Sequence, residues 1–142
     1  MIIMLVDKKA IKNFIPQREP FIMIDNLLSA NDTNFTSTFE IIPENIFLSK
    51  GILSEAALVE NIAQTCAAGF GYLGTQSGES ESRLGFIGAV SKLEVLGESK
   101  VNDCIDTTVT VLSRFENIYL IEGVATSGGA ELLRCQMKIV RA

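Results

Sequence analysis

The sequence predicts an α+β domain in which one long helix packs against one antiparallel sheet. Three observations support this prediction. One alanine-rich segment without proline has helical periodicity, and several other segments alternate apolar and polar residues as strands do. The length of 142 residues, with 47% hydrophobic content, suits a single core. We therefore expect residues 1–142 to form one domain.

The long helix is expected over residues 54–73, which read SEAALVENIAQTCAAGFGYL. Apolar residues recur there in steps of four, at Leu58, Ile62, Cys66 and Phe70. Ser54 is a suitable N-cap, and Glu55 complements the positive end of the helix dipole. Because the segment also holds five alanines, its neighbours can approach it closely, as a sheet wrapped around the helix would.

The C-terminal half is predicted to be a meander of strands. A period of two places Leu133, Cys135, Met137 and Ile139 on one face of a strand. Gly128-Gly129 before it favours a two-residue hairpin turn, since glycine adopts the positive φ angles that such a turn requires. A further strand over residues 105–112 is expected to turn into the next one at residues 114–117.

Upstream of the long helix we expect a short helix and then two strands, over residues 21–28 and 35–42, with a turn at residues 30–32. The polar stretch 74–83 is predicted to be an exposed loop after the helix. A strand over residues 86–95 follows. Three or four strands after the helix would complete the sheet.

Composition excludes several classes of function. A net charge of −5 disfavours binding to nucleic acid, which needs a basic surface. Residues 1–6 are apolar, but they lack the features of a signal peptide, and no apolar stretch reaches the roughly 20 residues that span a bilayer. We expect a cytoplasmic protein that binds neither nucleic acid nor membrane.

The three cysteines, Cys66, Cys104 and Cys135, are widely spaced and form no Cys-x-x-Cys pair. Since the chain contains no histidine, a zinc site is not expected, and no metal is predicted. We interpret Cys66 and Cys135 as small buried apolar residues.

Three segments resemble a known family. Residues 14–25, FIPQREPFIMID, resemble the Leu-Pro-His-Arg-aromatic-Pro-hydrophobic-Asp opening of the (3R)-hydroxyacyl-acyl-carrier-protein dehydratases, with Gln17 in place of its histidine. Residues 58–64, LVENIAQ, are similar to the helical Glu-Ala-hydrophobic-Ala-Gln motif of that family. Residues 86–93 resemble its next strand, so the resemblance covers most of the chain in the right order.

The resemblance implies the hot-dog fold, in which a sheet wraps around a long helix and two chains dimerise to form acyl tunnels. It also implies a reaction mechanism. A histidine removes the α-proton of a 3-hydroxyacyl thioester, and a glutamate from the helix of the other subunit handles the departing hydroxyl. Backbone N–H groups at the helix start polarise the thioester carbonyl. Residue-by-residue matching places the glutamate at Glu60.

The histidine is missing. The family carries it in a Gly-His-Phe-Pro-Gly segment ahead of the helix, and residues 44–51 occupy that place here. Ungapped matching puts Ile46 at the histidine position. The family's Pro-Gly corresponds to Ser54-Glu55.

Glu60 is the candidate catalytic residue, because its neighbours one turn away are small residues and Gln64, as in a narrow cleft. A solvated helical carboxylate is the alternative interpretation. The expected substrate-binding positions are Ile46, Phe47, Glu55, Gln64, Phe86 and Gly88. We interpret Asp25 as a strand-end residue that binds backbone.

Three hypotheses remain open. The first is a dehydratase-like enzyme of fatty-acid or polyketide-type metabolism that uses Glu60 with impaired autonomous activity. The second is a hot-dog acyl thioesterase in which Glu60 activates water. The third is a non-catalytic subunit paired with a histidine-bearing relative. Each implies an acyl thioester of acyl carrier protein or coenzyme A, no cofactor, and a homodimer, higher oligomer or heteromer.

Overall fold

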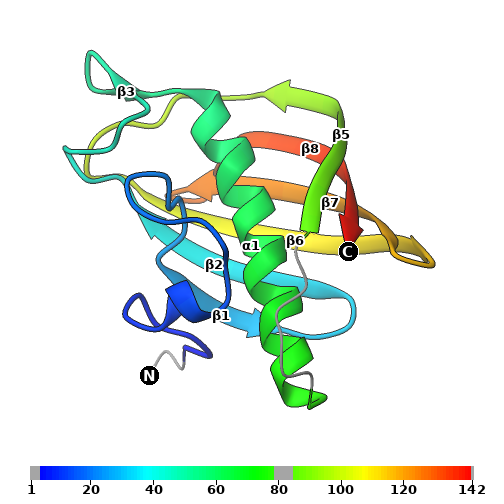
Figure 1. Ribbon diagram of the computed structural model, residues 1–142. Helices are drawn as coiled ribbons and strands as arrows, with labels where there is room; N and C mark the ends of the chain where they lie inside the picture. Colours follow the sequence, from blue (N-terminus) through cyan, green and yellow to red (C-terminus); the bar gives the residue numbers. More distant parts are fainter. Residues whose placement is uncertain (1–3, 79–84, 142) are drawn as a thin grey trace.

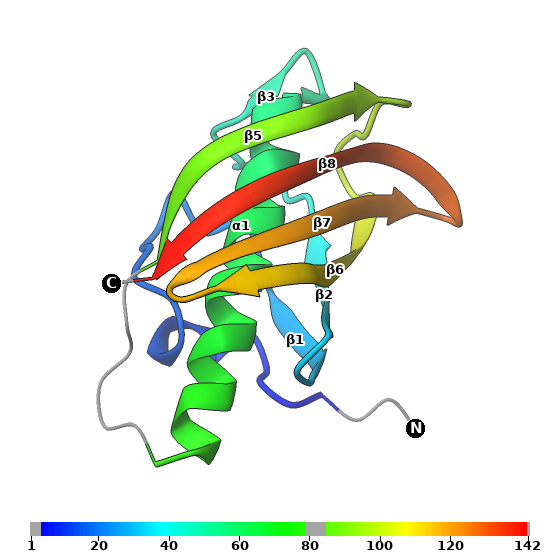
Figure 2. The same ribbon diagram turned by 90° about the vertical axis from the view of Figure 1, so that its right-hand side faces the viewer.

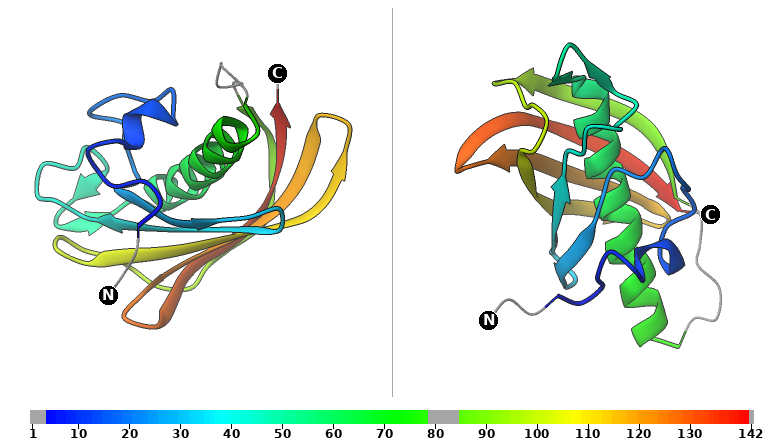
Figure 3. Two further views of the ribbon diagram at one scale, coloured as in Figure 1. Left: turned by 90° about the horizontal axis from the view of Figure 1, so that it is seen from below. Right: turned by 90° about the vertical axis from the view of Figure 1, so that its left-hand side faces the viewer.

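The computed structural model describes residues 4–78 and 85–141. Helix α1 (Glu55–Gln76) lies across one face of a six-stranded antiparallel sheet (Figure 1). The sheet curves around the helix, as the views along and across the helix show (Figures 2 and 3). This arrangement confirms the predicted α+β architecture of one helix on one sheet.

The strand order in the large sheet is β1-β2-β6-β7-β8-β5. Its strands are β1 (Asn26–Ala30), β2 (Asn34–Glu40), β5 (Gly85–Val95), β6 (Cys104–Phe115), β7 (Ile118–Ser127) and β8 (Ala130–Arg141). A small second sheet pairs β3 (Leu48–Ser49) with β4 (Ile52–Leu53), and a short 3-10 helix, η1, spans Ile11–Asn13.

Helix α1 begins as predicted. The Oγ of Ser54 accepts a hydrogen bond of 3.2 Å from the backbone N–H of Ala56, which confirms Ser54 as the N-cap. The helix continues to Gln76, so the expected loop starts later than residue 74. Residues 79–83 of that predicted loop lie outside the described residues.

The predicted hairpins are confirmed. Ser127 pairs with Ala130 across Gly128 (φ 58°) and Gly129 (φ 83°), so both turn residues have the left-handed backbone that glycine tolerates. β6 turns into β7 between Phe115 and Ile118. The apolar face predicted for β8 points into the core, where its four members are at most 5% exposed: Leu133, Cys135, Met137 and Ile139.

The strand expected over residues 21–28 is shorter in the structure. β1 begins at Asn26, and upstream of it the backbone at Phe21 and Met23 bonds to helix side chains instead of to another strand. The N–H of Met23 donates to Gln64 Oε1, and the carbonyls of Phe21 and Met23 accept from Gln64 and Asn61. The β3–β4 hairpin was not predicted, since two-residue strands leave no periodic pattern.

Glycines let the sheet approach the helix. A Cβ at Gly123 of β7 would overlap the side chain of Ile62, and one at Gly69 of α1 would overlap the ring of Phe35. Ile62 and Phe35 are fully buried. Close packing between helix and sheet therefore requires these glycines.

The two edges of the large sheet differ. The outer edge of β1 is partly covered, because Leu5 and Val6 donate backbone hydrogen bonds to Leu27. β5 pairs with β8 on one side, and among the described residues no strand pairs with its other side. All eleven residues of β5 are exposed, and five are large apolar residues: Phe86, Ile87, Val90, Leu93 and Val95. An open apolar edge of this kind is suited to pairing with another chain.

Within residues 4–78 and 85–141, no helix combines the length and the apolar character that crossing a bilayer requires.

Candidate functional site

A cavity of about 270 Å³ lies between α1, the N-terminal segment, and the paired ends of β5 and β8. It is slightly smaller than typical small-molecule sites. Most of its lining residues are apolar, and three have polar side chains. The lining residues are Phe14, Pro16, Gln17, Glu60, Ala63, Cys66, Ala67, Phe70, Gly71, Gly85, Phe86, Ile87, Ile139 and Arg141.

Glu60 reaches this cavity and is held by Gln64, one turn along α1. Gln64 Nε2 donates a hydrogen bond of 2.7 Å to Glu60 Oε2. The same nitrogen donates to the carbonyl of Phe21 at 2.9 Å, and Gln64 Oε1 accepts from the N–H of Met23 at 2.6 Å. Because the Gln64 side chain is fully buried and bonded at both ends, it fixes the position of one carboxylate oxygen.

A buried polar network continues from this point into the sheet. Asn61 Nδ2 donates to the carbonyl of Met23 at 2.7 Å, and Thr107 Oγ1 donates to Asn61 Oδ1 at 2.5 Å. Thr65 Oγ1 donates to the carbonyl of Asn61 and shares a 2.7 Å hydrogen bond with Ser37. Sequence reasoning missed Asn61 and Thr65, although polar residues at 61, 64 and 65 form one stripe of a helix that is otherwise apolar on that side.

A second pocket meets the first one at Glu60. It is lined by Gln17, Arg18, Phe21, Phe47 and Glu60. Arg18 and Phe21 are exposed, so this pocket opens on the surface. Glu60 therefore lies where an outer pocket joins an inner cavity lined mostly by apolar residues.

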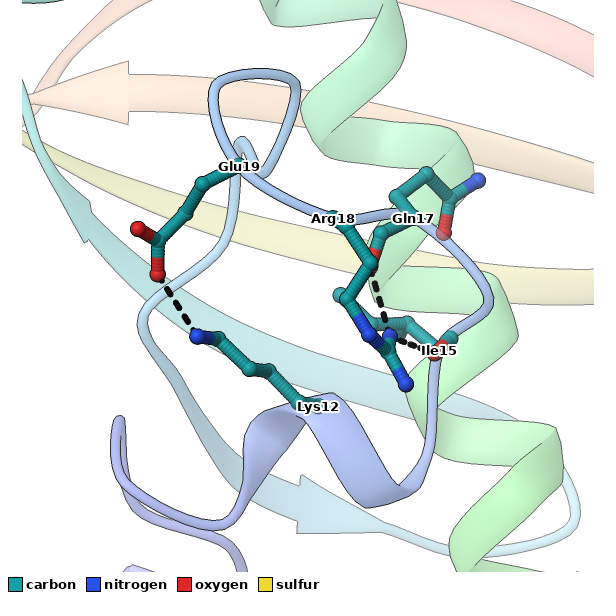
Figure 4. Close-up of polar contacts among 5 residues, drawn as sticks. All are labelled: Lys12, Ile15, Gln17, Arg18 and Glu19. Atoms are coloured by element: carbon teal, nitrogen blue, oxygen red, sulfur yellow. Dashed lines mark hydrogen bonds and ion pairs between the residues drawn. The ribbon is translucent and has the colours of Figure 1, made fainter.

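The N-terminal segment forms the wall between the pockets. Arg18 Nη1 donates to the carbonyls of Ile15 (2.9 Å) and Gln17 (2.7 Å), which curls the chain back on itself (Figure 4). Lys12 Nζ and Glu19 Oε1 form an ion pair of 2.7 Å. The Gln17 side chain projects over α1, and it lines both pockets.

Two polar atoms of the cavity-lining residues have no partner among the described residues. They are Gln17 Oε1, an acceptor, and Arg141 Nε, a donor, and both are buried. A buried polar atom without a hydrogen bond is costly. Since both atoms have almost no accessible surface, they do not face the open volume of the cavity.

The structure brings part of the expected site together. Glu60 and Phe86 line the inner cavity, Phe47 lines the outer pocket, and Gln64 binds Glu60 from behind. Three expected positions line neither pocket: Ile46, Glu55 and Gly88. Ile46 is 46% exposed, and its loop precedes β3.

Titratable groups around the site include two buried thiols. Burial raises the pKa of the Cys66 thiol, which faces the inner cavity, so Cys66 is a poor nucleophile. Burial also raises the pKa of Cys135 to about 11.

Asp25 Oδ2 accepts from the N–H of Glu40 at 2.8 Å, which confirms its interpretation as a backbone-binding residue. Among the described residues, no group of His, Cys, Asp or Glu side chains is placed to hold a metal ion.

Comparison with known families agrees with this geometry. Residues 9–142 match the model of the ApeP-like family, described as ApeP dehydratase. The chain belongs to the ApeP-like dehydratase family. The resemblance to hydroxyacyl dehydratases and the hot-dog fold are therefore confirmed.

Similar proteins are found in sequence and in structure. The Bacillus subtilis (strain 168) protein YcsD is 29% identical over 100 residues, which cover 68% of this chain and 72% of that one. The dehydratase heterocomplex ApeI:P from Xenorhabdus doucetiae contains a chain with a TM-score of 0.85 at 16% identity, covering 93% of this chain and 90% of that one.

A hypothetical thioesterase from Streptococcus pneumoniae TIGR4, solved with coenzyme A, has a TM-score of 0.66 at 12% identity. The match covers 82% of this chain and 84% of the thioesterase. At such identities the structural matches establish the hot-dog fold alone.

Proposed function

We propose that this chain binds a 3-hydroxyacyl thioester and supplies Glu60 to a dehydratase site whose histidine comes from a second subunit. The placement of Glu60 carries the proposal. Its carboxylate lies where an outer pocket meets an apolar cavity, and a buried glutamine fixes it. The chain has no histidine of its own, so a partner must provide the base of a two-residue dehydration.

The proposed reaction needs one base and one acid. The histidine of the second subunit takes the α-proton, and the electrons of the broken C–H bond form the α,β double bond. The bond between the β-carbon and the hydroxyl oxygen breaks, and Glu60 in its acid form protonates the departing oxygen. Water and an enoyl thioester result, and general acid and base each contribute typically 10²–10⁴-fold. Acyl carrier protein or coenzyme A is the proposed carrier.

Two observations support a second subunit. The outer edge of β5 is apolar and exposed over its whole length, and a similar chain occurs in a protein named as a dehydratase heterocomplex. In the family resemblance, each site joins the histidine of one chain to the glutamate of the other. A heteromer with a histidine-bearing relative would therefore contain one site built around Glu60.

The test uses a mixture in which the helix glutamate can come only from Glu60 of this chain. The chain is co-expressed with a histidine-bearing dehydratase from the same genome whose own helix glutamate is replaced by glutamine. Each protein alone should convert 3-hydroxyacyl-pantetheine to enoyl product very slowly, and the mixture should be at least about 100-fold faster. Glu60→Gln in this chain should abolish the gain.

Glu98→Gln is the matched control, because Glu98 is exposed and lines neither pocket. Equal activity of the mixtures made with the native chain and with its Glu60→Gln variant would refute the proposal. Full activity of this chain alone would refute the need for a second subunit.

A thioesterase is the second candidate function. A lone carboxylate beside a cavity can activate water without a histidine, and this chain has such a carboxylate in Glu60. The same assay separates the two functions, because hydrolysis releases free thiol from saturated acyl-pantetheine, whereas dehydration does not.

A further inference from the structure

The inner cavity follows one face of α1. The helix residues that line it recur in steps of three or four, so they share one side of the helix. From Glu60 to Phe70 the helix advances about 15 Å, at about 1.5 Å per residue. A volume of about 270 Å³ spread over that length makes the cavity a narrow channel. Its lining residues on α1 are Glu60, Ala63, Cys66, Ala67, Phe70 and Gly71.

Small side chains form the helix wall of this channel between Glu60 and Phe70. Ala63 and Ala67 are partly exposed, whereas Cys66 is buried, so the two alanines provide most of the open surface there. None of these three side chains is large enough to cross the channel. An unbranched acyl chain that starts at Glu60 can therefore extend along α1 as far as Phe70.

The walls of the channel come together at Phe70. The backbone of Phe14, in the N-terminal segment, lies so close to Gly71 that an added Cβ there would be 2.8 Å from the Phe14 carbonyl oxygen. The guanidinium carbon of Arg141, at the end of β8, lies 4.8 Å from the centroid of the Phe70 ring. N-terminal segment, helix and sheet thus meet around this one residue.

The Phe70 ring is held in place by other aromatic rings. Its centroid lies 5.0 Å from that of Phe35, with the two rings at 77° in an edge-to-face contact. The Tyr119 ring lies 4.6 Å away. Phe35 and Tyr119 are themselves buried in the core. The Phe70 ring therefore cannot turn away from an incoming chain without breaking these contacts.

We propose that Phe70 ends the acyl channel and so determines the longest acyl chain that this site accepts. The inference rests on the proposed acyl-binding function, with the thioester near Glu60 and the alkyl chain along Ala63 and Ala67. Each methylene before the ring leaves water and strengthens binding. A chain that extends past the ring must displace it and disturb a packed core. Phe70 thus acts on chain length and takes no part in the reaction.

The test uses saturated acyl-pantetheines, which cannot be dehydrated, with unbranched chains of increasing length. Calorimetry with the native protein should show Kd falling by about fourfold for each methylene, as expected for the burial of one CH₂ group. Once the chain reaches Phe70, Kd should stop falling or should rise. The chain length at this point is the length limit of the native channel.

Substitutions at two channel positions should move this limit in opposite directions. In Phe70→Ala, the first two methylenes past the native limit should each lower Kd by about fourfold again. Phe70→Leu keeps an apolar side chain in the core and should move the limit the same way by less, so it decides the question if Phe70→Ala does not fold. Ala67→Leu should move the limit to shorter chains, because its side chain would project into the channel before Phe70.

Phe39→Leu is the matched control for Phe70→Leu. Phe39 is a phenylalanine of β2 that is 4% exposed, and it lines neither the inner cavity nor the outer pocket. The same substitution there loosens the core without lengthening the channel. The length limit should therefore equal that of the native protein.

Several results would overturn the inference and leave the proposed acyl binding intact. They are a Kd that does not depend on chain length, a Kd that falls through the whole series, and a limit that stays unchanged in Phe70→Leu or in Ala67→Leu. A limit that moves equally in Phe39→Leu would also overturn it, since the change would then reflect a loosened core. If no member of the series binds to the native protein, the proposed function fails together with this inference.

Discussion

Gln64 Nε2 lies 2.7 Å from Glu60 Oε2, so a buried amide holds the one carboxylate that lines both pockets. Gln64 also ties the helix to the backbone at Phe21 and Met23. One side chain thus serves the stability of the fold and the position of the candidate catalytic group.

Gln64→Leu removes all three of these hydrogen bonds. It leaves the buried N–H of Met23 without a partner and removes the hydrogen bond to the carbonyl of Phe21, which should lower the free energy of unfolding by about 2 kcal/mol or more. Urea unfolding followed by circular dichroism measures this loss. Gln76→Leu, at an exposed glutamine of the same helix, should change stability by less than about 0.5 kcal/mol. Equal effects of the two changes would contradict the role of Gln64.

Ile46→His tests whether Ile46 occupies the position of the family's catalytic histidine. Ile46 is exposed and lies outside both pockets of its own chain, as expected of a residue that acts in a partner's site. The variant alone should dehydrate 3-hydroxyacyl-pantetheine at least about tenfold faster than the native chain, since an added general base contributes 10²–10⁴-fold in well-formed sites.

Adding Glu60→Gln to that variant should remove the activity. Leu48→His, two residues further along the chain at the start of β3, is the control and should remain inactive. Activity in Leu48→His, or none in Ile46→His, would show that Ile46 is not the equivalent position.

Val90→Lys tests the proposed interface at the edge strand. Val90 is 39% exposed in β5, and a lysine on an edge strand opposes pairing with another chain. Light scattering should show dimers of the native chain at micromolar concentration and monomers of the variant. Leu112 is 46% exposed, but its strand, β6, lies between two other strands of the sheet. The Leu112→Lys variant should therefore remain dimeric. A native monomer would contradict the interface.

Gly123→Ala tests the close approach of sheet and helix. The added Cβ would overlap the side chain of Ile62, which is fully buried. Overpacking of this kind should cost about 1–3 kcal/mol, measured as a shift of the urea midpoint. At Gly88 of β5 the nearest atom to such a Cβ is 3.5 Å away, an ordinary contact, so Gly88→Ala should have little effect. A stabilised Gly123→Ala variant would refute the packing argument.

Asp25 gives the fold a pH dependence. Burial raises the pKa of its carboxyl above the ordinary value of 3.8, although the hydrogen bond from the N–H of Glu40 lowers it in part. The unfolded chain therefore loses this proton at a lower pH than the folded chain, so ionisation of Asp25 destabilises the fold as pH rises above about 4. Above the raised pKa the cost is constant.

Asp25→Asn removes this titration. Urea unfolding at a series of pH values should show its stability increasing relative to the native chain as pH rises from about 4 and then levelling off. A difference that changes in the opposite direction would show that the pKa of Asp25 is lowered.

The sequence by itself determined the architecture, because the features that encode it are local and periodic. Apolar residues in steps of four, with Ser54 as cap, specify the helix, and Gly128-Gly129 specifies a hairpin. The alternation from Leu133 to Ile139 specifies which face of β8 is buried. The family motifs identified Glu60 as the candidate glutamate and showed that Ile46 stands at the position of the family's histidine.

The tertiary structure decided which residues share a site, because these contacts join segments that no local pattern connects. Arg141 ends the last strand and reads in sequence as an ordinary surface residue, yet pairing of β8 with β5 places it at the cavity over Phe70. Gln17 meets Glu60 because the backbone before β1 bonds to the helix, and β1 therefore begins later than the predicted strand. Hydrogen bonds from Gln64 and Asn61 to that backbone outweigh its β propensity, since buried N–H and carbonyl groups must find partners.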